Sequence, residues 1–267
     1  MSQLPDATLL KNITIPGAHD SGSTLGGFGD YARCQNLSIG VQLNLGVRYL
    51  DIRCYPDGEI LPIYHGLYFQ EITFGDVLAQ IGDFFAENPK ETVIMRMQQE
   101  NGGDSATYKK ILRDTYIGKE CWRGLFYQAT SFPNLGAARG KIVLVTGLPY
   151  IDNTVWWSDA ELKKQDESEV GLDAKKKAIS DHVNAALSNP TGFYINHISR
   201  QWDLLHDPEW YSQQLNPYLL ELLRKLRGQY PTASARPRLG VIAFDFVNKS
   251  LCQDVIAWNF LDGSGSY

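Results

Sequence analysis

The chain has 267 residues, of which 43% are apolar, and this is enough for one large hydrophobic core or two modest ones. Its net charge of −5 argues against a general nucleic-acid binder, which would carry a basic surface. No apolar stretch approaches the roughly 18–20 residues that a transmembrane helix needs.

Short β-rich runs alternate with segments of helical period, a pattern that favours an α/β architecture. Eight strands are predicted, at residues 13–15, 48–53, 61–64, 92–97, 125–127, 142–146, 193–196 and 240–245. Six helices are predicted at residues 37–45, 74–87, 106–115, 174–187, 213–227 and 250–259. The polar stretches 156–173 and 230–238 are expected to be surface loops. We therefore predict one domain over residues 1–267, an irregular (β/α)8 TIM barrel.

Polar residues gather where the predicted strands end: His19, Asp20, Arg53, His65 and Asp245. In such a barrel the site forms at the carboxyl ends of the strands. Because side chains at i and i+2 of a strand share a face, Asp51 and Arg53 are expected to face one space. Two imidazoles, an arginine and several carboxylates around a cavity suit phosphodiester cleavage. One histidine takes a proton, the other gives one, and the arginine holds the charge on the phosphate oxygens.

The other histidines and the cysteines are interpreted more plainly. We interpret His182 and His206 as structural residues, whereas His197 ends a predicted strand and ranks as a weaker candidate for the pocket. The four cysteines form no CxxC pair, and no histidine stands at zinc-finger spacing: Cys34, Cys54, Cys121 and Cys252. A structural zinc site is therefore not predicted, while isolated thiols and one or two disulfides both stay open.

Several motifs resemble one family. Residues 15–22 read Ile-Pro-Gly-Ala-His-Asp-Ser-Gly, residues 46–53 read Gly-Val-Arg-Tyr-Leu-Asp-Ile-Arg, and residues 64–66 read Tyr-His-Gly. In this order they resemble the X region of phosphatidylinositol-specific phospholipase C, above all its small single-domain bacterial and fungal members. Weaker matches at residues 88–95, 139–144 and 240–248 extend the resemblance over nearly the whole chain. The family implies a distorted (β/α)8 barrel that cleaves phosphatidylinositol to diacylglycerol and inositol 1,2-cyclic phosphate.

The resemblance implies a role for each histidine. His19 would be the general base on the inositol 2-hydroxyl, with Asp245 orienting it as a carboxylate fixes the tautomer of a catalytic histidine. His65 would protonate the leaving glycerol oxygen, with Asp20 as its partner.

Arg53 would bind the non-bridging phosphate oxygens, with Asp51 holding its guanidinium in place. Metal-dependent relatives carry an acidic calcium ligand at the matching position. A fixed guanidinium supplies positive charge without a metal and would repel a cation bound close by. We therefore predict catalysis that needs no calcium and no other cofactor.

The pocket for the head group departs from the family pattern. The metal-free relatives have a lysine, an arginine and a stacking tyrosine where this chain has Gln98, Gly147 and Ser168. Asp166 matches a carboxylate that binds inositol hydroxyls. Arg96 shares a strand face with Gln98 and is a candidate to replace the lost cation. The departure leaves the choice of head group more open than the reaction type.

The expected partners are an inositol phospholipid and, transiently, a membrane surface. Trp156, Trp157 and Trp202 follow predicted strands on the catalytic face, where indole rings can enter a lipid interface. Packing of these rings against the barrel rim is the alternative. No nucleic acid is expected, and a monomer is. The family implies secretion, but no signal peptide is visible in residues 1–11, so a cytoplasmic location is the other expectation.

Two other functions stay open. A metal-dependent glycerophosphodiesterase would need a cluster of acidic metal ligands, against which Arg53 argues. A catalytically inactive scaffold that binds inositol lipids would be supported by the loss of a histidine, but both His19 and His65 are present.

Overall fold

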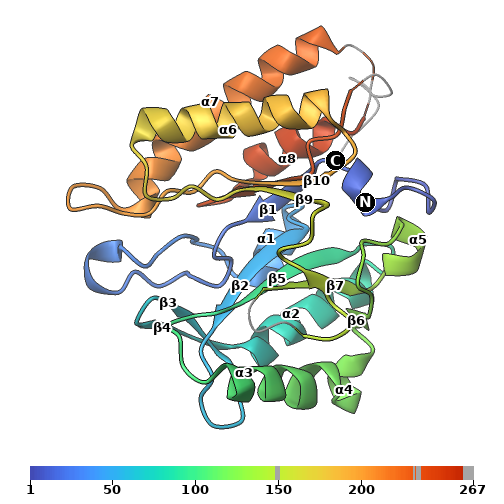
Figure 1. Ribbon diagram of the computed structural model, residues 1–267, viewed down its shortest axis with the longest axis vertical. Coiled ribbons are helices and arrows are strands. Elements are labelled where there is room, and N and C mark those ends of the chain that lie inside the picture. Colours follow the sequence, from blue (N-terminus) through green and yellow to red (C-terminus); the bar gives the residue numbers. More distant parts are fainter. Residues whose placement is uncertain (148–150, 231, 233–235, 261–267) are drawn as a thin grey trace.

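The computed structural model describes residues 1–147, 151–230, 232 and 236–260. Eleven strands belong to one curled sheet (Figure 1). They are β1 (Ile15–Ala18), β2 (Tyr49–Cys54), β3 (Pro62–His65), β4 (Tyr68–Thr73), β5 (Val93–Gln99), β6 (Phe126–Tyr127), β7 (Ile142–Thr146), β8 (Val155–Trp156), β9 (Leu162–Gln165), β10 (Phe193–His197) and β11 (Val241–Phe244).

Eight of these strands pair in parallel in the order β6-β7-β5-β2-β1-β11-β10-β9. Strand β8 adds a short parallel pairing to β7. Within the described residues, no ladder joins β9 to β6 or β8, so the sheet is a curled, open half-barrel. The predicted α/β fold with an irregular barrel is confirmed. The carboxyl ends of the parallel strands consequently lie on one side of the molecule.

Helices cover the outside of the curled sheet on two sides. In Figure 1, α6, α7 and α8 lie above the strands and α2, α3 and α4 below them. The α-helices are α1 (Ile39–Asn44), α2 (Phe74–Glu87), α3 (Ser105–Ile111), α4 (Glu120–Arg123), α5 (Leu135–Ala138), α6 (Leu172–Ser188), α7 (Pro208–Gln229) and α8 (Lys249–Ala257). Two 3-10 turns, η1 (Leu10–Asn12) and η2 (Phe28–Asp30), and the π-helical η3 (Leu112–Ile117) complete the set. All six predicted helices are present; α2 has the predicted bounds, and the ends of the other five are shifted.

The alternation of side chains along β2 sets up the site. Leu50, Ile52 and Cys54 belong to the core between sheet and helices, whereas Tyr49 belongs to the core inside the curl. Successive residues of a strand point to opposite faces. Asp51 and Arg53 therefore point to the interior with Tyr49, at the end of the strand where the interior opens.

Two predictions about the strands are wrong. Strand β3 is not a barrel strand: it pairs antiparallel with β4 in a hairpin and touches β2 through Cys54 and Ile63. The stretch 156–173 is not only a loop, because it contains β9. In β9, Leu162 is buried and the two lysines that follow it are exposed. Charged residues are common in a strand at the end of a sheet, and because of them this segment contains no apolar run that would predict a strand. In the other predicted loop, residues 231 and 233–235 lie outside the described residues.

Candidate active site

His19 follows β1 and contacts two charged partners, one on each ring nitrogen. Nδ1 lies 2.7 Å from Oδ1 of Asp245, which follows β11. Nε2 lies 2.8 Å from Nη2 of Arg53. A guanidinium can only donate, so Nε2 accepts and the imidazole proton is on Nδ1, where it is donated to Asp245. Burial, and then the charge of Arg53, lower the pKa of His19 to about 3. His19 is therefore a neutral base at physiological pH.

Asp245 is buried beneath that ring. Burial, together with the nearby carboxylate of Asp20, raises the pKa of Asp245. A more basic carboxylate is a stronger acceptor for the proton on Nδ1 of His19. The pair therefore fixes both the tautomer and the orientation of the imidazole.

Arg53 is held between two buried carboxylates. Its Nη2 lies 3.2 Å from Oδ2 of Asp51, and its Nη1 lies 3.4 Å from Oδ2 of Asp20. Although burial alone would raise it, Arg96 and Arg53 together keep the pKa of Asp51 below its usual range. The guanidinium is thus a fixed cation whose donors are directed to the interior of the curl.

His65 reaches the same space from the β3–β4 hairpin. Its Nδ1 lies 2.8 Å from the carbonyl oxygen of Ala32 and 3.5 Å from Oδ2 of Asp20. Because a carbonyl oxygen only accepts, Nδ1 carries the proton. Nε2 is then the nitrogen left for a substrate. Asp20 lies beside His65, the partner that the resemblance implies for it, and also beside Arg53.

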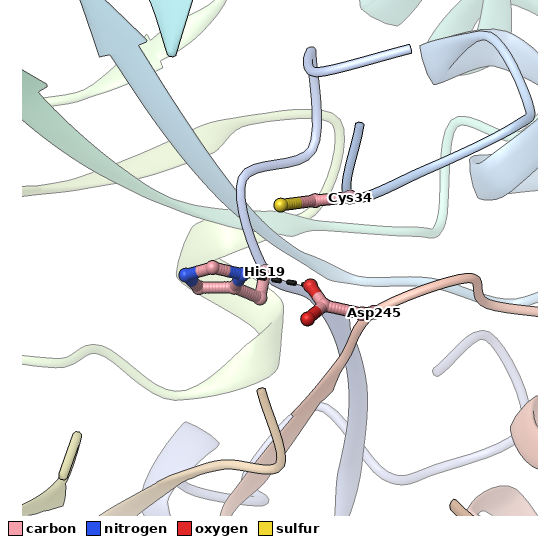
Figure 2. Close-up of side chains that lie close together, drawn as sticks. All are labelled: His19, Cys34 and Asp245. Carbon is pink, nitrogen blue, oxygen red and sulfur yellow. Dashed lines mark hydrogen bonds and ion pairs between the residues drawn. The ribbon is translucent and has the colours of Figure 1, made fainter. Parts of the chain in front are cut away.

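The thiol of Cys34 lies next to both histidines. Its Sγ is 3.7 Å from Nδ1 of His65 and within 4.8 Å of the nearest ligand atoms of His19 and Asp245. Figure 2 shows this thiol beside the hydrogen-bonded His19–Asp245 pair. Burial, and then the carboxylates of Asp245 and Asp20, raise the pKa of the thiol. Cys34 is therefore a neutral thiol and a poor nucleophile.

Asp166 follows β9 and is oriented by two side chains. Nδ1 of His197 lies 3.2 Å from its Oδ1, and Nη1 of Arg96 lies 3.4 Å from its Oδ2. Burial would raise the pKa of Asp166, but His197 and then Arg96 hold it below its usual range. A fixed carboxylate therefore lines the same cavity as Arg53.

The guanidinium of Arg96 is surrounded by partners. Besides Asp166, its Nη1 lies 3.5 Å from Oδ1 of Asp51, and its Nη2 donates to Oε1 of Gln98 at 2.6 Å. The guanidinium carbon lies 4.1 Å from the centre of the Trp157 ring. Arg96 thus faces the pocket as predicted, but its charge is balanced by Asp51 and Asp166.

One cavity of about 470 Å³ joins these groups. Its lining includes two histidines, three arginines, two carboxylates and an amide: His19, His65, Arg53, Arg96, Arg200, Glu100, Asp166 and Gln98. The two imidazoles therefore open onto the same space, which a general base and a general acid acting on one phosphodiester require.

Comparison with known proteins agrees with this site. The family described as phosphatidylinositol-specific phospholipase C, X domain, matches residues 23–147. A 1-phosphatidylinositol phosphodiesterase of Listeria monocytogenes is 30% identical, and the alignment covers 97% of this chain and 84% of that protein. This chain belongs to the phosphatidylinositol-specific phospholipase C family.

Solved structures of the family have the same fold. The phosphatidylinositol-specific phospholipase C from Listeria monocytogenes superposes with a TM-score of 0.85 at 28% identity, covering 97% of each chain. The Staphylococcus aureus enzyme superposes with a TM-score of 0.84 at 25% identity, covering 97% of this chain and 96% of that one. A 1-phosphatidylinositol phosphodiesterase of that species is 26% identical over 92% of this chain and 87% of its own length.

The sequence underrated one residue of this phospholipase C site. His197 ends β10, the same kind of position as His19, but a histidine at a strand end is more often structural. The structure places its ring 5.4 Å from that of His19 and its Nε2 3.4 Å from the hydroxyl of Tyr49. Position at a strand end was the one signal available, and the contact with Asp166 was not visible in the sequence.

The predicted membrane-contacting tryptophans lie in different settings. Trp156 and Trp202 are 45% and 41% exposed, whereas Trp157 is half-buried and packs on Arg96 and the interior core. Trp157 thus fits the alternative of packing against the barrel rim.

The four cysteines are free, and of these only Cys121 is exposed.

Proposed function

We propose that this chain is a phosphatidylinositol-specific phospholipase C that releases diacylglycerol and inositol 1,2-cyclic phosphate without a metal. The observation that carries the proposal is the placement of His19 and His65 on one cavity with Arg53 between their partners. The relatives in Listeria and Staphylococcus are named 1-phosphatidylinositol phosphodiesterases, which supports the same substrate class.

In the first step, Nε2 of His19 takes the proton of the inositol 2-hydroxyl as its oxygen attacks phosphorus. The hydroxyl replaces the N–H of Arg53 at Nε2, and the guanidinium then holds the phosphate oxygens. Asp245 stabilises the imidazolium that forms, because it accepts the proton of Nδ1 at 2.7 Å. As the bond between phosphorus and the glycerol oxygen breaks, His65 acts as the general acid and protonates that oxygen.

The head group is proposed to be an uncharged polyol. Asp166 accepts hydrogen bonds from its hydroxyls, while Arg96 acts mainly by holding Asp166 and Gln98 rather than as a free cation. The charge of the Arg96 guanidinium is already balanced by Asp51 and Asp166. Arg96 therefore adds little attraction for an extra phosphate on the inositol ring.

The decisive experiment is a head-group panel assayed in excess chelator. We expect phosphatidylinositol micelles to yield cyclic inositol phosphate at full rate, with phosphorylated inositol lipids and glycerophosphodiesters cleaved far more slowly. If the enzyme instead prefers a glycerophosphodiester, it is a related phosphodiesterase rather than a phospholipase C. Loss of activity in chelator that calcium restores would contradict the metal-free mechanism.

We also propose that an apolar rim around the cavity enters the lipid surface. The rim consists of Leu67 in the β3–β4 turn, of Tyr68 and Phe69 at the start of β4, and of Trp202, Leu204 and Leu205 in the loop after β10. Leu67, Leu204 and Leu205 are 85%, 90% and 83% exposed, and the neighbouring Gly66 and Trp202 line the cavity. The Staphylococcus aureus relative binds membranes, and its membrane binding has been modulated. This supports a membrane-binding surface on the present chain.

The double variant Leu204→Ser/Leu205→Ser tests the rim. Burying one leucine side chain is worth about 2 kcal/mol, so binding to phosphatidylcholine–phosphatidylinositol vesicles should weaken by at least about tenfold in a sedimentation assay. Leu9→Ser, an exposed leucine before the amino end of β1, is the matched control and should bind normally. Equal binding by the two variants would remove the loop from the proposed surface.

The whole chain is proposed to work as one catalytic domain and as a monomer. No helix in the described residues is long and apolar enough to cross a membrane. Secretion stays a prediction that activity measurements on culture medium and cell extract would test.

A further inference from the structure

Three potential metal ligands meet on one side of the cavity. Cys34, His65 and Asp20 each place one ligand atom within 4.8 Å of the other two. Sγ of Cys34 is 3.7 Å from Nδ1 of His65, and that nitrogen is 3.5 Å from Oδ2 of Asp20. In a tetrahedral zinc site, bond lengths of about 2.0–2.3 Å put sulfur and nitrogen about 3.6 Å apart and nitrogen and oxygen about 3.4 Å apart. Two of the three separations therefore match those of tetrahedral ligands, and the third, from Sγ of Cys34 to the Asp20 carboxylate, is at most 4.8 Å.

A second observation points to the same place. Oδ2 of Asp20 is fully buried and has no hydrogen-bond partner within the part of the chain that the structure describes. Two groups lie near this oxygen: Nη1 of the Arg53 cation at 3.4 Å and Nδ1 of the His65 imidazole at 3.5 Å. A buried carboxylate oxygen without a hydrogen bond is costly, and a coordinated cation would satisfy it.

We propose that Cys34, His65 and Asp20 bind a thiophilic divalent ion such as Zn²⁺, and that this ion inhibits the enzyme. A thiolate and an imidazole favour Zn²⁺, Cd²⁺ or Co²⁺, whereas Ca²⁺ and Mg²⁺ prefer oxygen ligands. The ion displaces the thiol proton, which passes to solvent, while the proton on Nδ1 of the neutral His65 ring moves to Nε2, and water fills the fourth position. Cys34 and His65 line the cavity, so the ion can enter from solvent.

Charge also permits a cation here. The guanidinium of Arg53 opposes it, but Arg53 is already shared between Asp20 and Asp51. The carboxylate of Asp245 and the thiolate formed on binding add negative charge within 4.8 Å of each other. The site thus has more negative than positive groups once the thiol proton has left.

Inhibition follows from the atom that the ion takes. With Nδ1 coordinated and a proton on Nε2, the imidazole of His65 cannot hold the second proton that a general acid must deliver. This consequence rests on the role proposed above for His65, whereas metal binding itself does not.

Inhibition is tested with Zn²⁺ added to metal-free enzyme. We expect saturating Zn²⁺ to lower the rate by about 10²-fold, the size of a lost general acid, and excess chelator to restore it. Cys34→Ala and Cys34→Ser should lose this sensitivity, each variant being compared with its own rate in the metal-free state. Cys121→Ala, which removes the exposed cysteine of α4, is the matched control and should stay sensitive. Equal inhibition of the Cys34 variants and the wild type would overturn the proposal.

Binding is tested separately by Co²⁺ absorption in the Cys121→Ala background. A thiolate-to-cobalt charge-transfer band should appear and should vanish when Cys34→Ala is added. Absence of the band, or its persistence without Cys34, overturns the proposed metal site even if the phospholipase C activity is as proposed. A Cys34-dependent band in a protein that does not cleave phosphatidylinositol would support the site and refute the proposed function instead.

Discussion

Alanine at position 65 or at position 19 is expected to lower kcat for phosphatidylinositol cleavage by about 10²–10⁴-fold, the usual effect of losing a general acid or base. In His19→Ala, no group accepts the proton of the attacking hydroxyl. The hydrogen bond from Nδ1 to Asp245 at 2.7 Å fixes the tautomer in which Nε2 is the acceptor. In His65→Ala, the glycerol oxygen leaves unprotonated. Release of cyclic inositol phosphate and of diacylglycerol measures both rates.

A histidine outside the cavity gives the matched control. His182 lies on α6 and packs edge-on against Tyr194, with ring centres 5.3 Å apart. His182→Gln should therefore cleave at close to the wild-type rate. A folded His19→Ala or His65→Ala enzyme with full activity would refute the two-histidine mechanism. Melting temperatures of all three variants show whether a loss of rate reflects a loss of fold.

Much of this site could be predicted because it depends on local rules. The i, i+2 spacing of Asp51 and Arg53 placed both side chains on the interior face of β2, and the structure agrees. His19 and Asp245 follow strands that turned out to be neighbours in the sheet, so the rule about carboxyl ends brought them together.

His65 was placed in the site for an incorrect reason. We expected it at the end of a barrel strand, whereas it ends one arm of an antiparallel hairpin. Short apolar runs do not reveal which strand they pair with, so the run before His65 looked like the others. The resemblance to the family, not the strand pattern, was the sounder basis for His65.

Other parts of the site depend on contacts that no local pattern contains. Cys34 lies in an irregular segment, and its approach to His65 at 3.7 Å arises only when the hairpin folds over it. The contact between His197 and Asp166 likewise joins two strand ends, one of which belongs to the unpredicted β9. A side chain's pairing partner is a tertiary property, and the sequence could not supply it.

Replacement of Arg53 by methionine is expected to lower kcat by about 10²–10³-fold, as the loss of one preorganised donor to a developing oxyanion does. Arg53→Lys should recover part of this rate, because it keeps the charge but not the two-pronged geometry. Melting temperatures are needed for both variants. Removing the guanidinium leaves Asp20 and Asp51 buried without their shared cation, which is a destabilising change.

A second readout separates electrostatics from loss of fold. After burial, the charge of Arg53 is the largest cause that lowers the pKa of His19 to about 3. Loss of that charge in Arg53→Met should raise the pKa toward the ordinary value of about 6.5 without reaching it, because the ring stays buried. An NMR titration of the His19 ring protons measures the shift, and Arg53→Lys should stay closer to the wild type. An unchanged titration in Arg53→Met would mean that the guanidinium does not act on the base, and the division of roles between Arg53 and His19 would have to be abandoned.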